Sequence, residues 1–518
     1  MTNRDDNYER LRDLCNRRLS QRRLVLASNR GPVEYHLTSD GQLEGSRGSG
    51  GVVTALSNIS QFIEVDWIAS AMGEGDRQAV KRTNQGGIMV SQSDGKLHLH
   101  FIVTQRNTYH KFYSIFCNPL LWFLQHYMWN SPRTPNIDRA VHDAWENGYI
   151  PVNQAFAGAV TEETSRDRLL PIVMLHDYHL YLAGGYIREQ RPDLVIQHFT
   201  HIPWPSPSYW QLLPASMRQP ILRSLCSVDI VGFQTARDVR NFLHCCQTFI
   251  KEADIDYRQQ AVMVNEHTAQ VKAYPISIDV ASLNKLAVSP AVQEYEAKLF
   301  PLFGEKTIVR VDRAEPSKNI LRGFRAFDTL LGRYPQLQGK VKFVAFLVPT
   351  RTHLRQYQRY MEETIQLIEV INTKYGTWDW KPIHFFFENN YLQAIAGMRL
   401  YDVLLVNAVI DGMNLVAKEG PTVNKRDGVL ILSDTVGACE QLGQYCLTIT
   451  PTDIEGTTQA MYNALTMPAS ERHGRAAALK QSIKKEDVTN WLWHLLEDTA
   501  NLVEQRSQTP ILGSAPHH

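Results

Sequence analysis

Short apolar runs separated by helical stretches recur along the chain, and this alternation constrains the fold more than any other feature. In the first half the runs lie at 24–28, 172–175, 195–200 and 230–233. After Tyr274 the pattern restarts, with runs at 307–311, 343–348, 383–387, 403–406 and 429–432. Strands that alternate with helices form βαβ units and parallel sheets. The sequence therefore predicts an α/β fold of two doubly wound, Rossmann-like domains, with an inter-domain cleft as the expected ligand site.

The same pattern sets the expected domain boundaries. Residues 1–22 carry both charge signs and predict a solvated helical extension, with a partner-binding arm as the alternative. A first Rossmann-like domain is expected over 23–270 and a second over 271–484. A helix over 485–505 follows, and 506–518 form a loose polar tail.

Composition excludes several classes of function. The 518 residues are 43% hydrophobic and 21% charged, which is enough material for two cores. A formal net charge of +1 disfavours nucleic-acid and anionic-membrane binding. The seven cysteines form no C-x-x-C pair, no apolar leader begins the chain, and no apolar run reaches about 18 residues. We therefore expect a reduced, cytoplasmic protein. The oligomeric state stays open, a homo-oligomer included.

The segment Asp411–Glu419 follows the apolar run 403–406 and predicts a turn that opens a helix. A helix N-terminus presents free backbone N–H groups and a positive dipole end, which suit a phosphate. The carboxylates of Asp411 and Glu419 are suited to accept hydrogen bonds from sugar hydroxyls. The alternative is an ordinary strand–helix connection with surface acids.

Cations follow several predicted strands. Arg313 and Lys318 come after the run 307–311, where two cations could clamp a diphosphate. The alternative is a pair of solvated surface cations. Arg30, the pair Gly50–Gly51 and Arg351 also follow strands or turns, and are further candidates for phosphate contact.

Histidines and aromatic residues mark the first half of the chain. His176–His179 and His201 follow two predicted strands, so they should lie at one edge of the sheet. No metal site is expected, because the spacing of the histidines fits no standard ligand pattern. An aromatic-rich stretch contains Tyr113 and Trp122, which either stack on a sugar or belong to the core.

These motifs together resemble those of the retaining family-20 glycosyltransferases, from about residue 23 to 500. The motifs are Ser28-Asn29-Arg30, Gly50-Gly51, His176–Leu180, His201–Pro205, Arg313 with Lys318, and Asp411–Glu419. The resemblance implies the GT-B fold, in which the C-terminal helix crosses back onto the first domain. It also implies transfer of glucose from UDP- or GDP-glucose to glucose-6-phosphate, giving trehalose-6-phosphate, with no cofactor and no metal.

The resemblance also implies roles for individual residues. The donor-binding residues are Gly51, His201, Arg313, Lys318, Asp411, Asn414, Leu415, Val416 and Glu419. Four of them would act in catalysis: His201, Arg313, Lys318 and Asp411. The acceptor-binding residues are Arg30, Tyr113, Trp122, Asp177 and Arg351. The two cations and the N–H groups of 414–416 would hold the diphosphate, Glu419 the ribose, and Asp411 the glucose hydroxyls.

One departure leaves the acceptor open. Family members that make trehalose-6-phosphate typically carry a tryptophan three residues after the position of Trp67, and here that residue is Ser70. The alternative is the same donor chemistry on another sugar, polyol or cyclitol phosphate, as in the pseudo-glycosyltransferase branch of validoxylamine 7'-phosphate synthase. A third hypothesis is a non-catalytic sugar-phosphate-binding regulatory protein, which the intact donor residues argue against. The sequence does not distinguish UDP from GDP or ADP.

Overall fold

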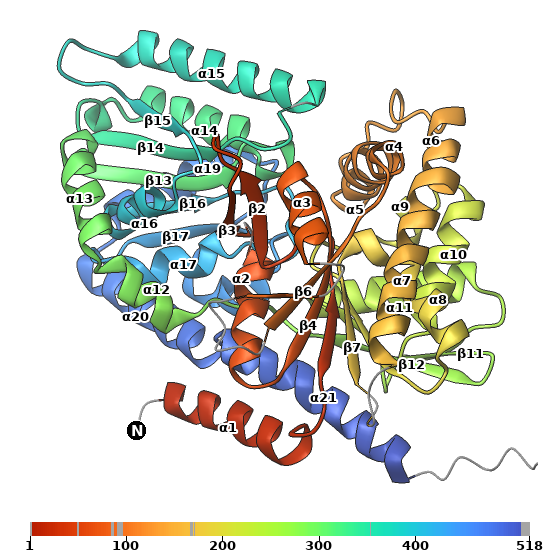
Figure 1. Cartoon of the computed structure of the whole chain (residues 1–518). Coiled ribbons are helices and arrows are strands. Elements are labelled where there is room, and N and C mark those ends of the chain that lie inside the picture. Colours follow the sequence, from red (N-terminus) through yellow and green to blue (C-terminus); the bar gives the residue numbers. More distant parts are fainter. Residues whose placement is uncertain are drawn as a thin grey trace, which may run out of the picture. The chain divides into compact units, whose positions relative to one another are not determined.

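The chain divides into two compact units (Figure 1). The computed structural model describes residues 3–48, 51–83, 87–90, 97–165, 169, 171–352 and 354–508. Unit 1 comprises residues 1–274 and 489–518, and unit 2 comprises 275–488. Within the described ranges, no helix combines the length and the apolar character that crossing a membrane requires.

Unit 1 is built on a ten-stranded sheet, ordered β10-β11-β12-β9-β8-β7-β1-β4-β6-β5. Its strands are β1 (Leu24–Ala27), β4 (Val65–Ser70), β5 (Ile88–Met89), β6 (Leu97–Ile102), β7 (Ile172–His176), β8 (Val195–Phe199), β9 (Ile230–Phe233), β10 (Asp254–Asp256), β11 (Ala261–Val264) and β12 (His267–Ala273). From β12 to β6 all neighbours pair in parallel. β5, β10 and β11 pair antiparallel, and a separate hairpin joins β2 (Val33–Leu37) to β3 (Leu43–Arg47).

The four strands predicted for this half are confirmed as β1, β7, β8 and β9. Their sequences are mostly apolar, because both faces of a parallel sheet are covered by helices. β4 and β6 escaped prediction, since polar residues interrupt their apolar character in VDWIAS and LHLHFI.

The described part of unit 1 also contains helices. They are α1 (Asn3–Arg18), α2 (Gly51–Ser57), α3 (Glu74–Arg82), α4 (Arg106–His110), α5 (Phe123–Gln125), α6 (Arg139–Ala144), α7 (Ile150–Thr164), α8 (Ala183–Gln190), α9 (Pro207–Trp210), α10 (Ala215–Cys226), α11 (Ala236–Phe249) and, from Thr489 on, α21 (Val488–Gln508). Between α4 and α5 the backbone forms a π-helical segment, η2 (Lys111–Trp122), and a second, η3 (Trp145–Tyr149), precedes α7.

We expected a solvated helix at the N-terminus, but α1 is packed against the rest of unit 1 along one face. Leu11, Leu14 and Cys15 on one of its faces are buried. It lies beside α21 (Figure 1), where Nε of Arg18 donates to Glu504 at 2.6 Å and the guanidinium of Arg10 stacks on Trp493. The prediction rested on the charged residues, although Leu11, Leu14, Cys15 and Leu19 have the spacing of one helix face.

Unit 2 has a six-stranded, fully parallel sheet ordered β15-β14-β13-β16-β17-β18. Its strands are β13 (Lys306–Arg313), β14 (Val341–Val348), β15 (Ile383–Phe387), β16 (Val403–Val406), β17 (Val429–Ser433) and β18 (Leu447–Ile449). The five predicted strands are all confirmed, and only the short β18 was not predicted. The hydrophobic core of unit 2 contains residues of four of these strands: Ile308, Phe343, Leu405 and Ile431.

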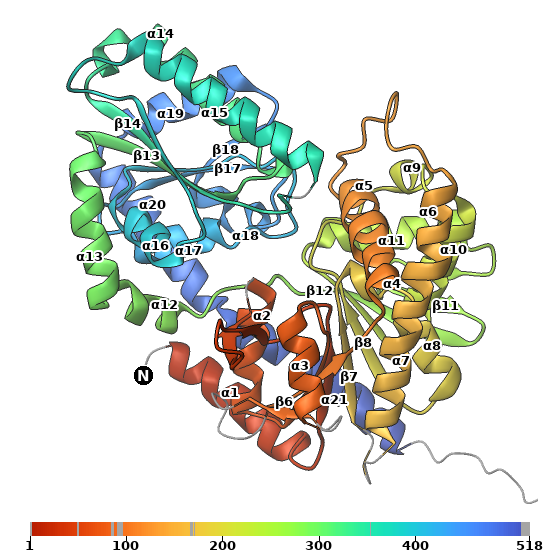
Figure 2. The same ribbon diagram turned by 45° about the horizontal axis from the view of Figure 1, so that its top comes forward.

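Helices cover both faces of this sheet, so unit 2 is doubly wound. They are α12 (Val280–Ala287), α13 (Pro290–Leu299), α14 (Ile320–Arg333), α15 (Arg355–Tyr375), α16 (Tyr391–Leu400), α17 (Val416–Val423), α18 (Cys439–Leu442), α19 (Ile454–Thr466) and α20 (Ala469–Lys485). Figure 2 shows α14, α15 and α19 on one face and α13, α16, α17 and α20 on the other. The two units therefore have the predicted α/β, GT-B class of fold.

Candidate functional site

Polar side chains of unit 2 gather at the carboxyl ends of β13 and β16. Arg313 is the last residue of β13, Lys318 ends the short helix η6 (Pro316–Lys318), and Asp411 follows β16. Nζ of Lys318 donates a hydrogen bond to Oδ2 of Asp411. The fold thus brings together two motifs that are distant in the sequence. We call Arg313, Glu315, Lys318 and Asp411 the unit 2 cluster.

Lys318 keeps its charge in spite of its burial. Its side chain is only 10% exposed. Burial lowers the pKa of its ammonium, but the carboxylates of Asp411 and Glu315 raise it, and the net pKa is above the ordinary value. A fixed, poorly solvated cation attracts an anion more strongly than a solvated one does.

Glu315 holds both cations of the cluster and was missed by the sequence analysis. Its buried carboxylate has Oε1 at 3.2 Å from Nη2 of Arg313 and 3.9 Å from Nζ of Lys318. The signal available in the sequence was a carboxylate two residues after one cation and three before the other. The side chain of Arg313 is 51% exposed, so its guanidinium is accessible to a ligand.

The turn before α17 presents free backbone donors beside this cluster. Asn414 adopts a left-handed conformation with φ of 67°, which asparagine tolerates better than most residues. Its Nδ2 donates to Oδ2 of Asp411 at 3.1 Å, and its Oδ1 accepts from the N–H of Ala417. In the described part of the chain, the N–H groups of Asn414, Leu415 and Val416 have no hydrogen-bond acceptor. They suit an anion at the positive end of the helix.

Glu419 lies in the first turn of α17, with Oε1 accepting a hydrogen bond from the hydroxyl of Tyr391 at 3.0 Å. Burial raises the pKa of the Glu419 carboxyl. Tyr391 was not predicted, and its exposed ring lies at the start of α16. A carboxylate held in this way is a fixed acceptor for hydroxyl groups.

Several predicted site residues have an unusual backbone conformation. Asp177, Arg351 and Asn414 have φ of 74°, 46° and 67°. Such positions carry a conformational cost and tend to occur at functional sites. This observation supports three predicted residues independently of their side-chain chemistry.

Arg351 follows β14 and belongs to unit 2, although it was predicted together with acceptor residues of unit 1. Its Nη1 donates to the hydroxyl of Tyr357 at 2.5 Å. Its predicted role stays a prediction.

In unit 1, Arg30 follows β1 and meets an aromatic stack. Nη1 of Arg30 donates to Oε1 of Glu34 at 2.9 Å. Burial lowers the pKa of its guanidinium, and Tyr113 and Glu34 more than offset that effect. The ring of Tyr113 is stacked between those of Tyr109 and His179, with centroids 5.6 Å and 6.0 Å away. Arg30 and Tyr113 are thus neighbours, as a shared ligand would require.

Trp122 is not part of this stack. It is buried at the end of η2, where its ring stacks on that of His126 with centroids 4.0 Å apart. Within unit 1 Trp122 is therefore a core residue, and its contact with an acceptor stays a prediction.

Ser70 ties neighbouring strands together. It ends β4, is buried, and donates from Oγ to Oδ1 of Asn29 at 3.0 Å. The hydroxyl of Tyr109 donates to the same oxygen at 3.2 Å. The position where a tryptophan was expected thus carries a hydrogen-bonded hydroxyl next to Arg30.

Asp177 connects the ends of β7 and β8. Its Oδ1 accepts a hydrogen bond from the backbone N–H of His201 at 3.2 Å. The sequence predicted that these residues meet at the carboxyl ends of adjacent strands, and the parallel pairing of β7 with β8 places them there.

Both ring nitrogens of His201 have protein partners. Nε2 lies 3.1 Å from Nδ1 of His176, and Nδ1 lies 3.3 Å from Nε2 of Gln234. Burial, with the neighbouring His176 and His198, lowers the pKa of His201 well below its usual value, so the ring is neutral. A side-chain hydrogen bond from His201 to a sugar would require it to leave one of these partners. Gln234 was not predicted.

Gly51 begins α2, and Gly50 lies outside the described residues.

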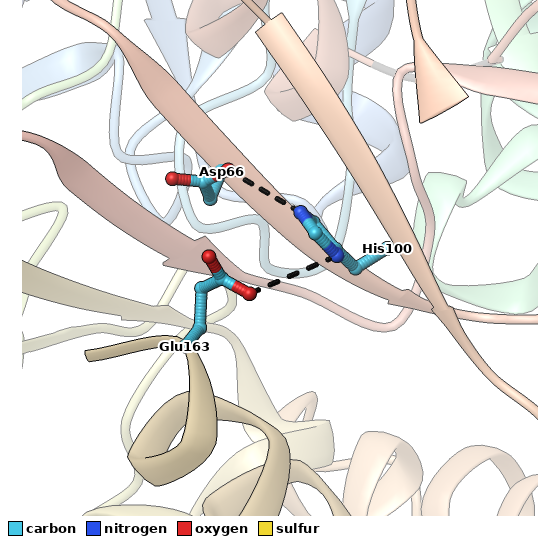
Figure 3. A group of neighbouring side chains, drawn as sticks. All are labelled: Asp66, His100 and Glu163. Atoms are coloured by element: carbon cyan, nitrogen blue, oxygen red, sulfur yellow. Dashed lines mark hydrogen bonds and ion pairs between the residues drawn. The ribbon is translucent and has the colours of Figure 1, made fainter. Parts of the chain in front are cut away.

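A different cluster consists of Asp66, His100 and Glu163 (Figure 3). The imidazole of His100 lies between the carboxylates, with Nε2 at 3.3 Å from Asp66 and Nδ1 at 3.9 Å from Glu163. The guanidinium of Arg23 bonds both acids as well. Asp66 stands near the start of β4, at the edge of the sheet opposite to Asp177 and His201. The cluster is therefore an ion-pair network in which the chain supplies the cation.

Three kinds of comparison relate the chain to known proteins. The sequence profile described as Glycosyltransferase family 20 matches residues 22–501. Alpha,alpha-trehalose-phosphate synthase [UDP-forming] A of Dictyostelium discoideum is 30% identical over 476 residues, which are 90% of this chain and 61% of that longer protein. The chain thus spans less than two thirds of that relative.

Two further comparisons concern the donor and the acceptor. Validamine 7-phosphate valienyltransferase of Streptomyces hygroscopicus subsp. limoneus is 27% identical over 480 residues, covering 92% of this chain and 94% of that protein. The solved structure of trehalose-6-phosphate from E. coli bound with UDP-2-fluoro glucose superposes with a TM-score of 0.79 at 26% identity, covering 92% and 99% of the two chains.

Proposed function

Because the chain belongs to glycosyltransferase family 20, we propose that it is a retaining glucosyltransferase that moves glucose from UDP-glucose to glucose-6-phosphate. The products are trehalose-6-phosphate and UDP. The similar Dictyostelium protein is a UDP-forming synthase of this kind, and the similar E. coli structure holds a UDP-sugar analogue. These relatives favour UDP over the GDP and ADP that the sequence left open.

The observation that carries the proposal is the unit 2 cluster beside the free N–H groups of 414–416. Arg313 and Lys318 on one side, and the three backbone donors on the other, lie on the two turns that the hydrogen bond between Lys318 and Asp411 joins. A departing nucleoside diphosphate develops negative charge, and preorganised donors in a poorly solvated site stabilise it strongly. The positive charge comes from the chain, so the reaction needs no cofactor beyond the nucleotide sugar.

In the proposed donor complex, Arg313, Lys318 and the amides before α17 hold the diphosphate. Glu419 accepts hydrogen bonds from the ribose, and Asp411 from hydroxyls of the glucose. The ammonium of Lys318 is bonded to Asp411 in the free protein. A diphosphate would therefore compete with Asp411 for Lys318, which frees a carboxylate oxygen for the sugar.

In the proposed acceptor complex, Arg30 binds the phosphate of glucose-6-phosphate, with Arg351 as a second cation. Tyr113 and Trp122 offer aromatic surface to the sugar, and Asp177 accepts from a hydroxyl. His201 and Gly51 lie beside the transferred glucose. The support for Arg30 and Tyr113 is their contact with each other, and for Asp177 its bond to His201.

The chemistry needs no nucleophile from the protein. The bond between the anomeric carbon and the diphosphate oxygen breaks, and the acceptor hydroxyl forms a new bond on the same face. Its proton passes to an oxygen of the leaving diphosphate. The protein contributes positioning and stabilisation of the leaving group.

The test is the rate of UDP release by the purified protein with UDP-glucose and glucose-6-phosphate, in buffer containing a chelator. Release that requires glucose-6-phosphate supports the proposal. Release only with a cyclitol phosphate would favour the alternative, for which buried Ser70 and the similarity to the valienyltransferase speak. Thermal stabilisation by glucose-6-phosphate but not by UDP would favour the regulatory alternative. A homo-oligomer and a cytoplasmic location stay predictions, and seven free cysteines support the latter.

A further inference from the structure

A buried lysine that the proposed reaction does not use links the donor helix to the segment that joins the two units. Lys418 is the third residue of α17 and is fully buried. Its Nζ donates to the carbonyl oxygen of Ile276 at 2.8 Å. In the described ranges no carboxylate lies within ion-pair distance of this ammonium, whereas Lys318 has two.

Burial of this kind is unfavourable. Burial lowers the pKa of Lys418 to about 7, which the more distant Glu486 only partly offsets. A single hydrogen bond to a neutral carbonyl does not offset the free energy that a buried ammonium loses with its hydration. Methionine or leucine would fill the same volume without that penalty. The stability of the fold therefore does not explain a lysine at position 418, and we look for the explanation in the two segments that its hydrogen bond connects.

The acceptor of this hydrogen bond, Ile276, lies two residues after the point where the chain passes from unit 1 to unit 2. We call residues 275–278 the joint segment, because Pro275 is the first residue of unit 2. Val488, the last residue of unit 2, donates its backbone N–H to the carbonyl of Ile278 at 3.0 Å. Both passages of the chain are thus tied to this segment, which is buried at Ile276, Ser277 and Ile278.

The other end of the bond belongs to the donor site. Lys418 is adjacent to Glu419 and follows the amides of 414–416 by two to four residues. Neighbouring residues of a helix point about 100° apart. One turn of α17 therefore offers Glu419 to the ribose while Lys418 holds the joint segment.

We propose that Lys418 is a positioning residue that couples the donor site to the joint segment, so that nucleotide binding at α17 changes the affinity of the protein for the acceptor. The proposal rests on the proposed function for the identity of the two ligands. An affinity change of this kind is a coupling free energy and is reciprocal between the ligands.

The test measures this coupling in Lys418→Met, with UDP and glucose-6-phosphate as probes. Calorimetry gives the Kd of each ligand alone and the Kd of glucose-6-phosphate at saturating UDP. In the wild type, UDP is expected to tighten glucose-6-phosphate binding by about fivefold or more. In Lys418→Met the ratio should fall below about twofold, while the Kd of UDP alone changes by less than about threefold, because every proposed donor contact remains.

The matched control is Lys480→Met. Lys480 also donates from Nζ to a backbone carbonyl, that of Asn424, which caps the opposite end of α17. It has no bond to the joint segment, so this variant should keep the wild-type ratio. A merely structural role of Lys418 would lower stability and weaken each ligand without changing the ratio.

A second variant keeps the test decisive if Lys418→Met does not fold. Lys418→Gln retains an N–H donor of shorter reach and should show an intermediate ratio. An unchanged ratio in a folded Lys418 variant overturns the inference, as does a wild type that binds both ligands without coupling. A wild type that binds neither ligand would instead overturn the proposed function.

Discussion

Arg313 and Lys318 share one proposed role but differ in burial, and this difference gives a specific prediction. Each cation is expected to stabilise the leaving diphosphate in the transition state. Loss of one such donor typically costs about 2.7–4 kcal/mol, a factor of about 10²–10³ in kcat. We therefore expect Arg313→Ala and Lys318→Ala each to lower kcat by about that factor.

The two variants should differ in stability. Lys318 is 10% exposed and bonded to Asp411, so its removal leaves a poorly solvated carboxylate without its cation. Breaking a buried pair in this way lowers the free energy of unfolding by about 3–5 kcal/mol. The side chain of Arg313 is 51% exposed, and its buried partner Glu315 keeps Lys318 at 3.9 Å, so the loss of Arg313 should cost less stability than the loss of Lys318.

The assay combines kcat from UDP release with urea unfolding of the same samples. Lys306→Ala serves as the control, because Lys306 begins β13, far from its catalytic end, and pairs with Asp402 at 3.5 Å. Wild-type kcat in Arg313→Ala would refute the diphosphate role. Equal losses of stability in the two variants would refute the account of their burial.

Three further predictions follow from the geometry. Arg30→Ala should raise the KM for glucose-6-phosphate at least about tenfold, as expected for loss of a charge-assisted phosphate contact, with little change for UDP-glucose; steady-state kinetics with an unchanged acceptor KM would contradict this. Asn414→Ala should lower the free energy of unfolding by about 1–2 kcal/mol and Asn414→Gly by less, because φ is 67°; denaturation that ranks the variants in the opposite order would count against the turn. Burial lowers the pKa of His176 and His198 to about 3, so below about pH 6.5 the unfolded chain binds protons that the folded protein does not. The free energy of unfolding should therefore fall by about 1.4 kcal/mol per pH unit for each histidine, until the pH nears 3. Urea unfolding followed by tryptophan fluorescence would contradict this if the free energy of unfolding were the same at about pH 6.5 and about pH 4.5.

The sequence predicted the architecture because parallel strands covered on both faces are continuous apolar runs. All nine predicted strands are present. The prediction failed where tertiary burial replaced a local pattern. β4 carries the buried Asp66, which is paired with Arg23 and with the half-buried His100 of β6, and the strands themselves do not reveal these partners.

The candidate site was predictable where a motif sits at a strand end. Lys318 and Asp411 meet as expected from parallel topology. The supporting residues were not predictable in the same way. Glu315 contacts Arg313 and Gln234 contacts His201, and both residues lie in turns. Residues in turns follow no hydrophobic periodicity, so the sequence pattern does not indicate them. The burial of Trp122 likewise depends on how η2 packs, which its sequence alone does not specify.

The central claim is that this chain joins two glucose units with retention. The most direct measurement is mass spectrometry and proton NMR of the product formed from UDP-glucose and glucose-6-phosphate. The account predicts a disaccharide monophosphate with both anomeric centres in the α configuration, formed together with one UDP. A β linkage, or bound UDP-glucose that gives no disaccharide with glucose-6-phosphate, would contradict it.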